Sequence, residues 1–353
     1  MFELPRAGRW QRGLLIAATA LCTTFAAYAA PTISRLVVFG DSLSDTGNTR
    51  ANVPGGNLAP IANAVGYGSN GRFSNGVLWH ETMATQLGLP AATASEVSGA
   101  NNWNYAYGGA RVDNEDGPST GVLRQYADYS SRIGSTGADP SALYVMWAGG
   151  NDARDLVGNS SPQAGIDISI GGLQTVLSGL ISQGASTFLI PNLPNLGMIP
   201  ENRGSARAGS ATEVSSMWNA SLFDMLMGFA DQASIYFLDV YSIFDDVLLN
   251  PGDYGFTNTT GQCRSTSFGG LVENSCANAH QWTFWDAIHP TTAAHAVIGR
   301  AAADLLLNGS PLRLAVPEPS VLVLVLLGLG LMSGRLRRLV PAMRTRALPL
   351  AST

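Results

Sequence analysis

The stretch Val37–Asn48 reads VVFGDSLSDTGN, and it decides the fold of this chain. Its first residues are β-branched or aromatic, which is typical of a short buried strand. Gly40 then permits a tight turn, and Ser42 lies within that turn. A serine at the end of a strand can serve as a nucleophile if a base lies beside it, although Ser and Asp are also common helix caps. The stretch therefore predicts a strand, a turn and a candidate nucleophile at Ser42.

A second stretch, Asp286–Pro290, has the residue types that would complete such a site. It reads DAIHP, so an acid precedes a histidine by three residues and one loop can carry both. His289 is the predicted base, and Pro290 favours non-helical backbone at the residue before it. Asp286 is the predicted acid, which would fix the tautomer of the imidazole and stabilise its charged form.

Other residues of the chain could fill these two roles. His80 and His295 lie in segments with helical patterning, so both are expected to be structural. His280 has no acid three residues before it. The alternatives to Asp286 as the orienting acid are Asp41 and Asp152.

Two further blocks lie between the serine and histidine stretches. Asn104–Ala110 reads NYAYGGA and Gly149–Asp152 reads GGND. Because the blocks occur in this order, the chain resembles the GDSL (SGNH) family of lipases and esterases over about residues 35–307. Softer matches are Asn70–Gly76 and Pro191–Gly197. The resemblance implies a hydrolase that cleaves carboxylic esters through an acyl-enzyme on Ser42 and uses no cofactor or metal.

The resemblance also implies which groups stabilise the negative charge that develops on the substrate. The expected donors of this oxyanion hole are the N–H groups of Ser42 and Gly109 and the side-chain amide of Asn151. Gly108 is an alternative to Gly109. Three aromatic residues beside this block are expected either to line an acyl or sugar pocket or to pack in the core; they are Trp103, Tyr105 and Tyr107.

Apolar runs alternate with amphipathic segments along the middle of the chain. Short buried strands are predicted at residues 35–40, 142–148, 186–191 and 234–240. Helical spacing of apolar residues is seen at Ile166, Ile170, Leu173, Leu177 and Leu180, and again at Ala294, Val297, Ile298, Ala301 and Leu305. This alternation predicts one three-layer α/β domain over residues 30–315, with a parallel sheet flanked by helices. The resemblance implies a flavodoxin-like order, with the site at the carboxyl ends of the strands.

Composition narrows the class of partner. The 353 residues have a net charge of −5, and residues 30–315 hold 12 Arg against 23 Asp and Glu. Phosphate backbones are bound by basic surfaces, so nucleic acid is not an expected partner. Cys263 and Cys276 form an even pair once a leader is removed, which predicts a disulfide in an exported protein; zinc binding is the weaker alternative.

Both ends of the chain carry targeting patterns. Residues 1–29 have an Arg-containing start, an apolar run and an AYA sequence, which predicts a secretory signal peptide; an uncleaved anchor is the alternative. Residues 316–338 read VPEPS, then an apolar run and an Arg cluster, which resembles the PEP-CTERM sorting signal that an exosortase processes. The last segment, 339–353, extends beyond the usual end of such a signal, and a plain membrane tail is the alternative. We expect an exported protein, extracellular or at the cell surface, with transient membrane association through residues 316–338.

The sequence thus predicts a secreted serine esterase or lipase with the triad Ser42, His289 and Asp286. A carbohydrate deacetylase or an acyltransferase of the same fold, acting on exopolysaccharide, is the first alternative. A surface-binding protein that keeps only the fold is the second. The expected partners are an ester substrate of lipid, short-chain or sugar type, a signal peptidase and an exosortase-like sorting enzyme.

Overall fold

A computed structural model describes residues 31–52, 67, 71–97, 99–113, 120–267, 272–314 and 329. Residue contacts divide the chain at Leu312 into two units, and the fold described below belongs to the first. The predicted signal peptide and, apart from residue 329, the predicted sorting segment and tail lie outside the described residues.

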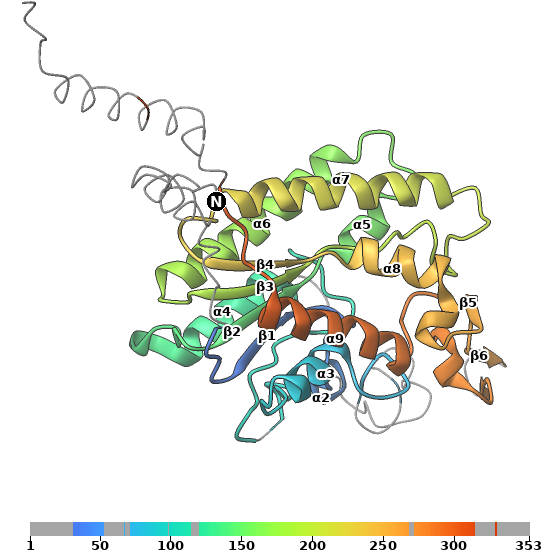
Figure 1. The fold of residues 1–353 in the computed structure, drawn as a ribbon, viewed down its shortest axis with the longest axis horizontal. Helices are drawn as coiled ribbons and strands as arrows, with labels where there is room; N and C mark the ends of the chain where they lie inside the picture. Colours follow the sequence, from blue (N-terminus) through green and yellow to red (C-terminus); the bar gives the residue numbers. More distant parts are fainter. Residues whose placement is uncertain are drawn as a thin grey trace, which may run out of the picture. The chain divides into compact units, whose positions relative to one another are not determined.

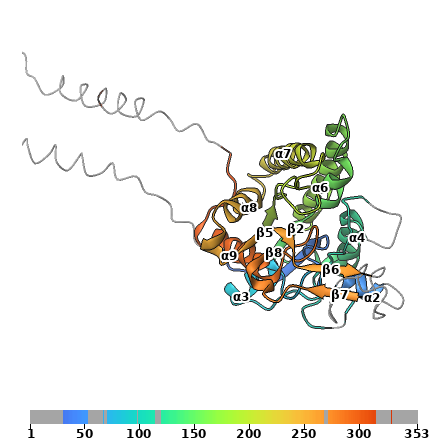
Figure 2. The ribbon, with the colours of Figure 1, turned by 90° about the vertical axis from the view of Figure 1, so that its right-hand side faces the viewer.

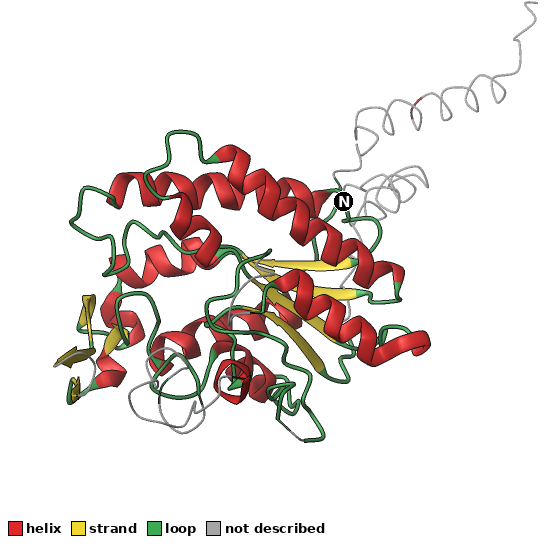
Figure 3. Ribbon diagram, turned by 180° about the vertical axis from the view of Figure 1, so that it is seen from behind, coloured by secondary structure: helices red, strands yellow, loops and turns green. Residues whose placement is uncertain are grey.

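A parallel four-stranded sheet lies at the centre of this unit (Figure 1). Its strands are β1 (Leu36–Gly40), β2 (Leu143–Trp147), β3 (Thr187–Pro191) and β4 (Ser234–Leu238), in that spatial order. Each strand falls within one of the predicted runs, because these are the segments with enough apolar side chains to be buried on both faces. The structure confirms the predicted α/β class and the parallel sheet between helices, seen from behind in Figure 3.

A fifth, strand-like segment extends the sheet beyond β1. Val38 donates its N–H to Trp103 O, and the N–H of Tyr105 donates to Val38 O. The chain runs from β1 to this segment on one side of it and then returns to β2 on the other side. The direction in which successive strands are added to the sheet therefore changes between β1 and β2. Ligands of open α/β sheets bind at such a switch point, outside the carboxyl ends of the strands.

Helices cover both faces of the sheet (Figures 1 and 2). One face carries α4 (Val122–Ile133), α6 (Gln163–Ser182) and α7 (Ala208–Met227), with the short α5 (Gly150–Leu156) beside them. The other carries α3 (Trp79–Gln86) and α9 (Thr292–Asn308), which pack against each other. The remaining helices are α2 (Asn48–Asn52) and α8 (Val240–Leu249).

The side chains of β1 alternate between the two cores that these helices enclose. Val37 and Phe39 pack with the α4, α6 and α7 side, whereas Leu36 and Val38 pack with the α3 and α9 side. Among the described residues, α6 is the helix that is long and apolar enough to span a bilayer, but its residues Ile166, Ile170, Leu173, Val176, Leu177 and Leu180 are buried in the protein core.

Two small sheets lie beyond the carboxyl ends of the main strands. β5 (Asn258–Gln262) pairs with β8 (Trp282–Phe284), and β6 (Arg264–Ser267) forms an antiparallel hairpin with β7 (Val272–Ser275). Within the described residues, short 3₁₀ turns accompany them and the helices at Gly134–Thr136, Pro251–Tyr254 and Ala279–Gln281. The sequence does not predict these small sheets, because β5, β6 and β7 lack an apolar run.

Candidate active site

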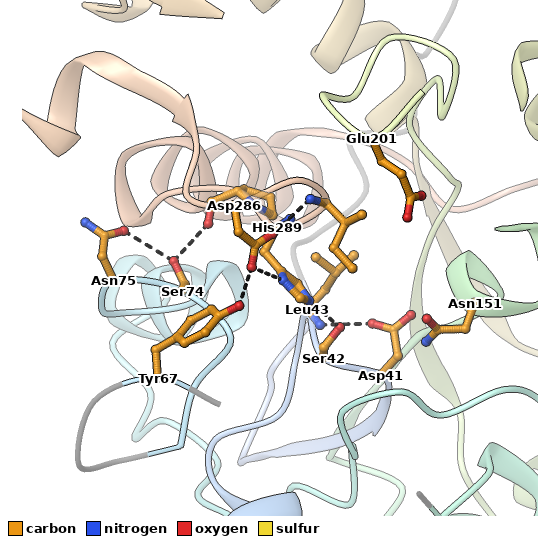
Figure 4. Close-up of polar contacts among 12 residues, drawn as sticks. Asp41, Ser42, Leu43, Tyr67, Ser74, Asn75, Asn151, Glu201, Asp286 and His289 are labelled. Atoms are coloured by element: carbon orange, nitrogen blue, oxygen red, sulfur yellow. Dashed lines mark hydrogen bonds and ion pairs between the residues drawn. The ribbon is translucent and has the colours of Figure 1, made fainter. Parts of the chain in front are cut away.

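The turn after β1 presents Ser42 at the carboxyl edge of the sheet (Figure 4). Gly40 has φ +149°, and a Cβ there would fall 2.2 Å from the carbonyl oxygen of Trp147 on the next strand. The turn closes when the N–H groups of Ser44 and Asp45 donate to Asp41 O. Glycine is therefore required where the chain leaves β1, as the sequence indicated.

His289 is hydrogen-bonded to both Ser42 and Asp286. Its Nε2 is 2.8 Å from Ser42 Oγ, and its Nδ1 is 2.7 Å from Asp286 Oδ2. A carboxylate accepts, so Nδ1 carries the hydrogen and Nε2 is left to accept the proton of the serine hydroxyl. The structure thus brings Ser42 to a histidine that lies 247 residues away in the sequence, with Asp286 behind it, in the order that base-assisted attack by a serine requires.

Asp286 is held as a carboxylate. Burial opposes its ionisation, but the neighbouring His289, the Tyr67 hydroxyl and the Ile288 N–H outweigh burial and lower its pKa below the usual range. Tyr67 Oη donates to Oδ2 at 2.5 Å, while the N–H groups of Ile288 and His289 donate to Oδ1 at 2.8 Å. The acid therefore keeps its negative charge and a fixed orientation toward the imidazole.

The loop that carries His289 is anchored at both sides. It lies between β8 and α9, as Pro290 indicated, and the N–H of Trp285 donates to His289 O. Thr291 caps α9 through its hydroxyl oxygen, which accepts from the Ala294 N–H. Ser74 donates its hydroxyl to Pro290 O, which connects the block Asn70–Gly76 to this loop (Figure 4).

Asn151 lies in the first turn of α5, directly after β2, and lines the same cavity as Ser42. Its Nδ2 donates to Ala110 O at 2.9 Å, and its Oδ1 accepts from Arg154 at 3.3 Å. Arg154 is itself held by a bidentate ion pair with Glu201. These contacts fix which way the amide points and leave it one further N–H to donate.

The two glycines of the block Asn104–Ala110 differ in what their N–H groups contact. The Gly108 N–H donates to Asp45 Oδ2 at 2.9 Å and to Thr49 Oγ1 at 2.7 Å. The Gly109 N–H has no hydrogen-bond partner among the described residues. Of the two alternatives, Gly109 is the one with a donor left for a substrate.

The rival acids and histidines make other contacts. Asp152 accepts from the Val112 N–H and from the Ser169 hydroxyl, and Asp41 accepts from the Leu43 N–H. His80 bonds Ser44 O. His295 is fully buried and His280 is exposed on a surface turn. No hydrogen bond joins any of these three histidines to Ser42 within the described residues.

Four residues that the sequence did not indicate support the site. Tyr67 contacts Asp286 as described above, and the Arg264 guanidinium lies 4.1 Å from the centre of the Tyr67 ring. Gln125 on α4 contacts the backbone of Gly40. Their partners are distant in sequence, so no local pattern indicates these roles. Asp45, five residues after Gly40 and within the first block, accepts from the N–H groups of Gly47, Asn48 and Thr49.

The predicted disulfide is present between Cys263 and Cys276, whose Cα atoms are 4.9 Å apart. It closes the base of the β6–β7 hairpin. The N–H of Cys263 donates to Phe284 O and that of Arg264 to Trp285 O, so the hairpin is fastened to the segment that leads to His289. Among the described residues, no group of three or more His, Cys, Asp and Glu lies close enough to hold a metal ion.

The three aromatic residues beside the glycine block lie in or against the core. Tyr105 stacks on Phe39 with ring centres 5.6 Å apart, Tyr107 is buried and donates to Glu96, and Trp103 lies under the Arg132 guanidinium. Among the described residues, none of the three lines the cavities that contain Ser42 or His289. Of the two roles that the sequence left open, core packing is the one observed.

Two cavities meet at His289. The first is apolar and begins at Ser42; its walls include Leu193, Leu196, Val240, Ile243, Phe244, Val247, Phe284, Ala294, Val297 and Ile298. The second is polar and lies on the Asp286 side; its walls include Tyr67, Arg154, Glu201, Gln262, Arg264, Ser265 and Asp286. Ile288, His289 and Arg154 border both cavities. The site therefore has an apolar side and a polar side.

The sequence of this chain is similar to those of known lipases, esterases and acyltransferases. Residues 36–302 match the family described as GDSL-like Lipase/Acylhydrolase. A GDSL esterase/lipase of Arabidopsis thaliana is 30% identical over 74% of this chain and 84% of its own length. A phosphatidylcholine-sterol acyltransferase of Aeromonas hydrophila is 26% identical over 80% of this chain and 93% of its own length.

Solved structures with similarity to the chain include a member of the lipolytic G-D-S-L family from Veillonella parvula. It has 15% sequence identity and a TM-score of 0.41, and the match covers 77% of this chain and 97% of that one.

Proposed function

The chain belongs to the family of GDSL-like lipases and acylhydrolases and is a hydrolase of ester bonds, and from that premise we propose that it cleaves carboxylic esters through an acyl-enzyme on Ser42. The hydrogen-bonded chain from Ser42 through His289 to Asp286 carries this proposal. His289 is the base, and Asp286 is the acid that orients it.

In the first step, Ser42 Oγ attacks the ester carbonyl while His289 Nε2 takes the hydroxyl proton. The tetrahedral oxyanion receives hydrogen bonds from the Ser42 N–H, the Gly109 N–H and the remaining N–H of Asn151. The bond between the carbonyl carbon and the alcohol oxygen then breaks. The alcohol oxygen takes the proton from His289, and the acyl group stays on Ser42.

In the second step, His289 takes a proton from a water molecule, which attacks the acyl carbon. The bond between the acyl carbon and Ser42 Oγ then breaks, Ser42 Oγ takes the proton back from His289, and the acid leaves. The carboxylate of Asp286 stabilises the imidazolium that forms in each step, because its lowered pKa keeps it charged. No step needs a metal or an organic cofactor.

The test is turnover of p-nitrophenyl esters by the wild-type protein and by Ser42→Ala. The variant should lose at least about a thousandfold in kcat, since the nucleophile is gone. Ser44→Ala is the matched control, because Ser44 lies two residues away in the same turn and is bonded to Trp79 and not to His289. Equal loss in both variants would contradict the proposal.

Acyl transfer is a second candidate, favoured by the similarity to a phosphatidylcholine-sterol acyltransferase. Transfer and hydrolysis share the acyl-enzyme and differ in whether water or an alcohol attacks it. Product analysis with glycerol as acceptor separates them, since transfer yields a glycerol ester and hydrolysis yields only the free acid.

We also propose export, with a signal peptidase acting at residue 29 and an exosortase-like enzyme acting near Pro317. The sequence patterns at the two ends support this proposal, as does the disulfide, because disulfides persist in oxidising compartments. Intact mass and cell fractionation should give a product from about Ala30 to about Pro317 in a host with the sorting enzyme. Retention of residues 321–353 in that host would instead support a plain membrane tail.

A further inference from the structure

The apolar cavity begins at the proposed nucleophile and continues between two helices. Asp41, Ser42 and Leu43 line it, α8 contributes Val240, Ile243, Phe244 and Val247, and α9 contributes Ala294, Val297 and Ile298. Val247 is 4% exposed and Val297 is 7% exposed, and both pack in the small core between α8, α9 and Phe256. A group covalently attached to Ser42 Oγ can therefore extend directly into an apolar space.

This cavity is narrow. Its volume is about 80 Å³, against about 390 Å³ for the polar cavity. A narrow apolar space suits a straight hydrocarbon chain, whereas the wider polar space suits a bulky group with hydroxyl or charged substituents.

The part of α8 that lines the cavity indicates how long an acyl chain can lie beside it. Val240 and Val247 both line the cavity and are about two turns apart, or ~10 Å along the helix. An extended hydrocarbon with carbon–carbon bonds of ~1.5 Å advances ~1.3 Å per carbon. The wall provided by α8 therefore matches a chain of about eight carbons.

The two sides of the ester have two cavities beside them. In the acyl-enzyme the acyl carbon is bonded to Ser42 Oγ, and Ser42 lines the apolar cavity, so the acyl chain extends into the apolar cavity. His289, which returns the proton to the alcohol oxygen, borders both cavities, so the polar cavity with Gln262, Arg264 and Ser265 is the adjoining space for the alcohol.

We propose that the preferred substrate is an ester of a straight acyl chain of about eight carbons with a polar, hydroxyl-bearing alcohol, and that Val247 at the far part of α8 limits the chain length. This inference rests on the proposed function and adds the substrate class to it. Each methylene that enters the cavity should raise kcat/KM about fourfold, until the chain reaches Val247.

The first experiment compares two esters that carry an eight-carbon chain on opposite sides of the ester bond, with the full-length protein as enzyme. Monooctanoyl glycerol has a long acyl chain and a polar alcohol, whereas octyl acetate has a short acyl group and an apolar alcohol. We expect kcat/KM to be higher for monooctanoyl glycerol by about a hundredfold or more. Comparable rates on the two esters, or a preference for octyl acetate, would overturn the inference.

The second experiment changes Val247 and measures p-nitrophenyl octanoate against p-nitrophenyl acetate. Val247→Phe should lower the octanoate-to-acetate ratio of kcat/KM by about tenfold or more, because the ring fills the cavity. Val247→Ala should shift the preferred chain to a longer one, which keeps the test valid if the larger side chain prevents folding. Leu249→Phe is the matched control, since Leu249 is on the same helix but is 78% exposed.

The outcomes separate the inference from the proposed function. If the folded wild-type protein cleaves the acetate ester and Ser42→Ala does not, but octanoate is not preferred, the esterase proposal holds and the acyl-chain inference fails. If the wild-type protein cleaves neither ester, both fail. An unchanged ratio in both Val247 variants would contradict the role of Val247.

Discussion

Gln125 hydrogen-bonds both backbone groups of Gly40. The Gly40 N–H donates to Gln125 Oε1 at 2.9 Å, and Gln125 Nε2 donates to Gly40 O at 2.8 Å. Gln125 is fully buried on α4, so this pair adds to the pairing of Gly40 with Trp147 at the last residue of β1. The side chain of one helix residue thereby fixes the point at which the chain turns toward Ser42.

Replacing this glutamine should weaken both stability and turnover. Gln125→Leu leaves the buried Gly40 N–H without a partner, which should cost about 1–3 kcal/mol in the free energy of unfolding. Turnover should fall as well, because the turn at Ser42 loses its anchor. Denaturant unfolding and esterase assays check this, with the exposed Gln232→Leu as control. An unfolding free energy equal to that of the control would contradict the role given to Gln125.

Asn151→Ala should lower kcat by about 10²–10³ and change KM much less, because the amide is proposed to bond the oxyanion and not the ground-state ester. Steady-state kinetics on a p-nitrophenyl ester measure both constants. Asn159→Ala is a suitable control, since this exposed asparagine follows the same helix. An unchanged kcat in Asn151→Ala would remove Asn151 from the oxyanion hole.

His295 should make the protein sensitive to acid. Burial lowers its pKa from 6.5 to about 3, and neither ring nitrogen has a hydrogen-bond partner among the described residues. The unfolded chain binds a proton below pH 6.5 and the folded chain does not, so stability falls as pH drops from about 6.5 toward 3. At pH 5 this histidine should cost about 2 kcal/mol relative to neutral pH.

Thermal unfolding at pH 7.5 and pH 5 tests this effect. His295→Phe should lose less stability between the two values than the wild-type protein does, while the exposed His280→Gln should behave like the wild type. Part of the acid loss should remain in His295→Phe, because burial also lowers the pKa of His80. Identical pH dependence in the wild type and His295→Phe would show that His295 is not responsible.

The main strands and the triad could be predicted because each depends on a local pattern. Apolar runs mark β1 to β4 within one or two residues at each end, and the blocks at Ser42 and His289 are short and specific. Ser42 and Asn151 lie at the same edge of the sheet, because each follows a parallel strand that ends there.

The contacts that hold these residues in place could not be predicted in the same way. Tyr67 is 219 residues from Asp286 in sequence, and Gln125 is 85 residues from Gly40. No repeat or spacing in the nearby sequence identifies either residue, because each acts through a contact that only the folded structure brings about. The choice between Gly108 and Gly109 likewise required knowing that Asp45 and Thr49 occupy the Gly108 N–H.

The proposed reaction depends on Ser42 as the nucleophile, and covalent labelling tests this role directly. The folded protein should react with a fluorophosphonate at one site, and mass spectrometry of a digest should place the adduct on Ser42. Labelling should be lost in Ser42→Ala, kept in Ser44→Ala and strongly slowed in His289→Ala, since the base is then absent. An adduct on another serine, or labelling of Ser42→Ala at the wild-type rate, would contradict the account.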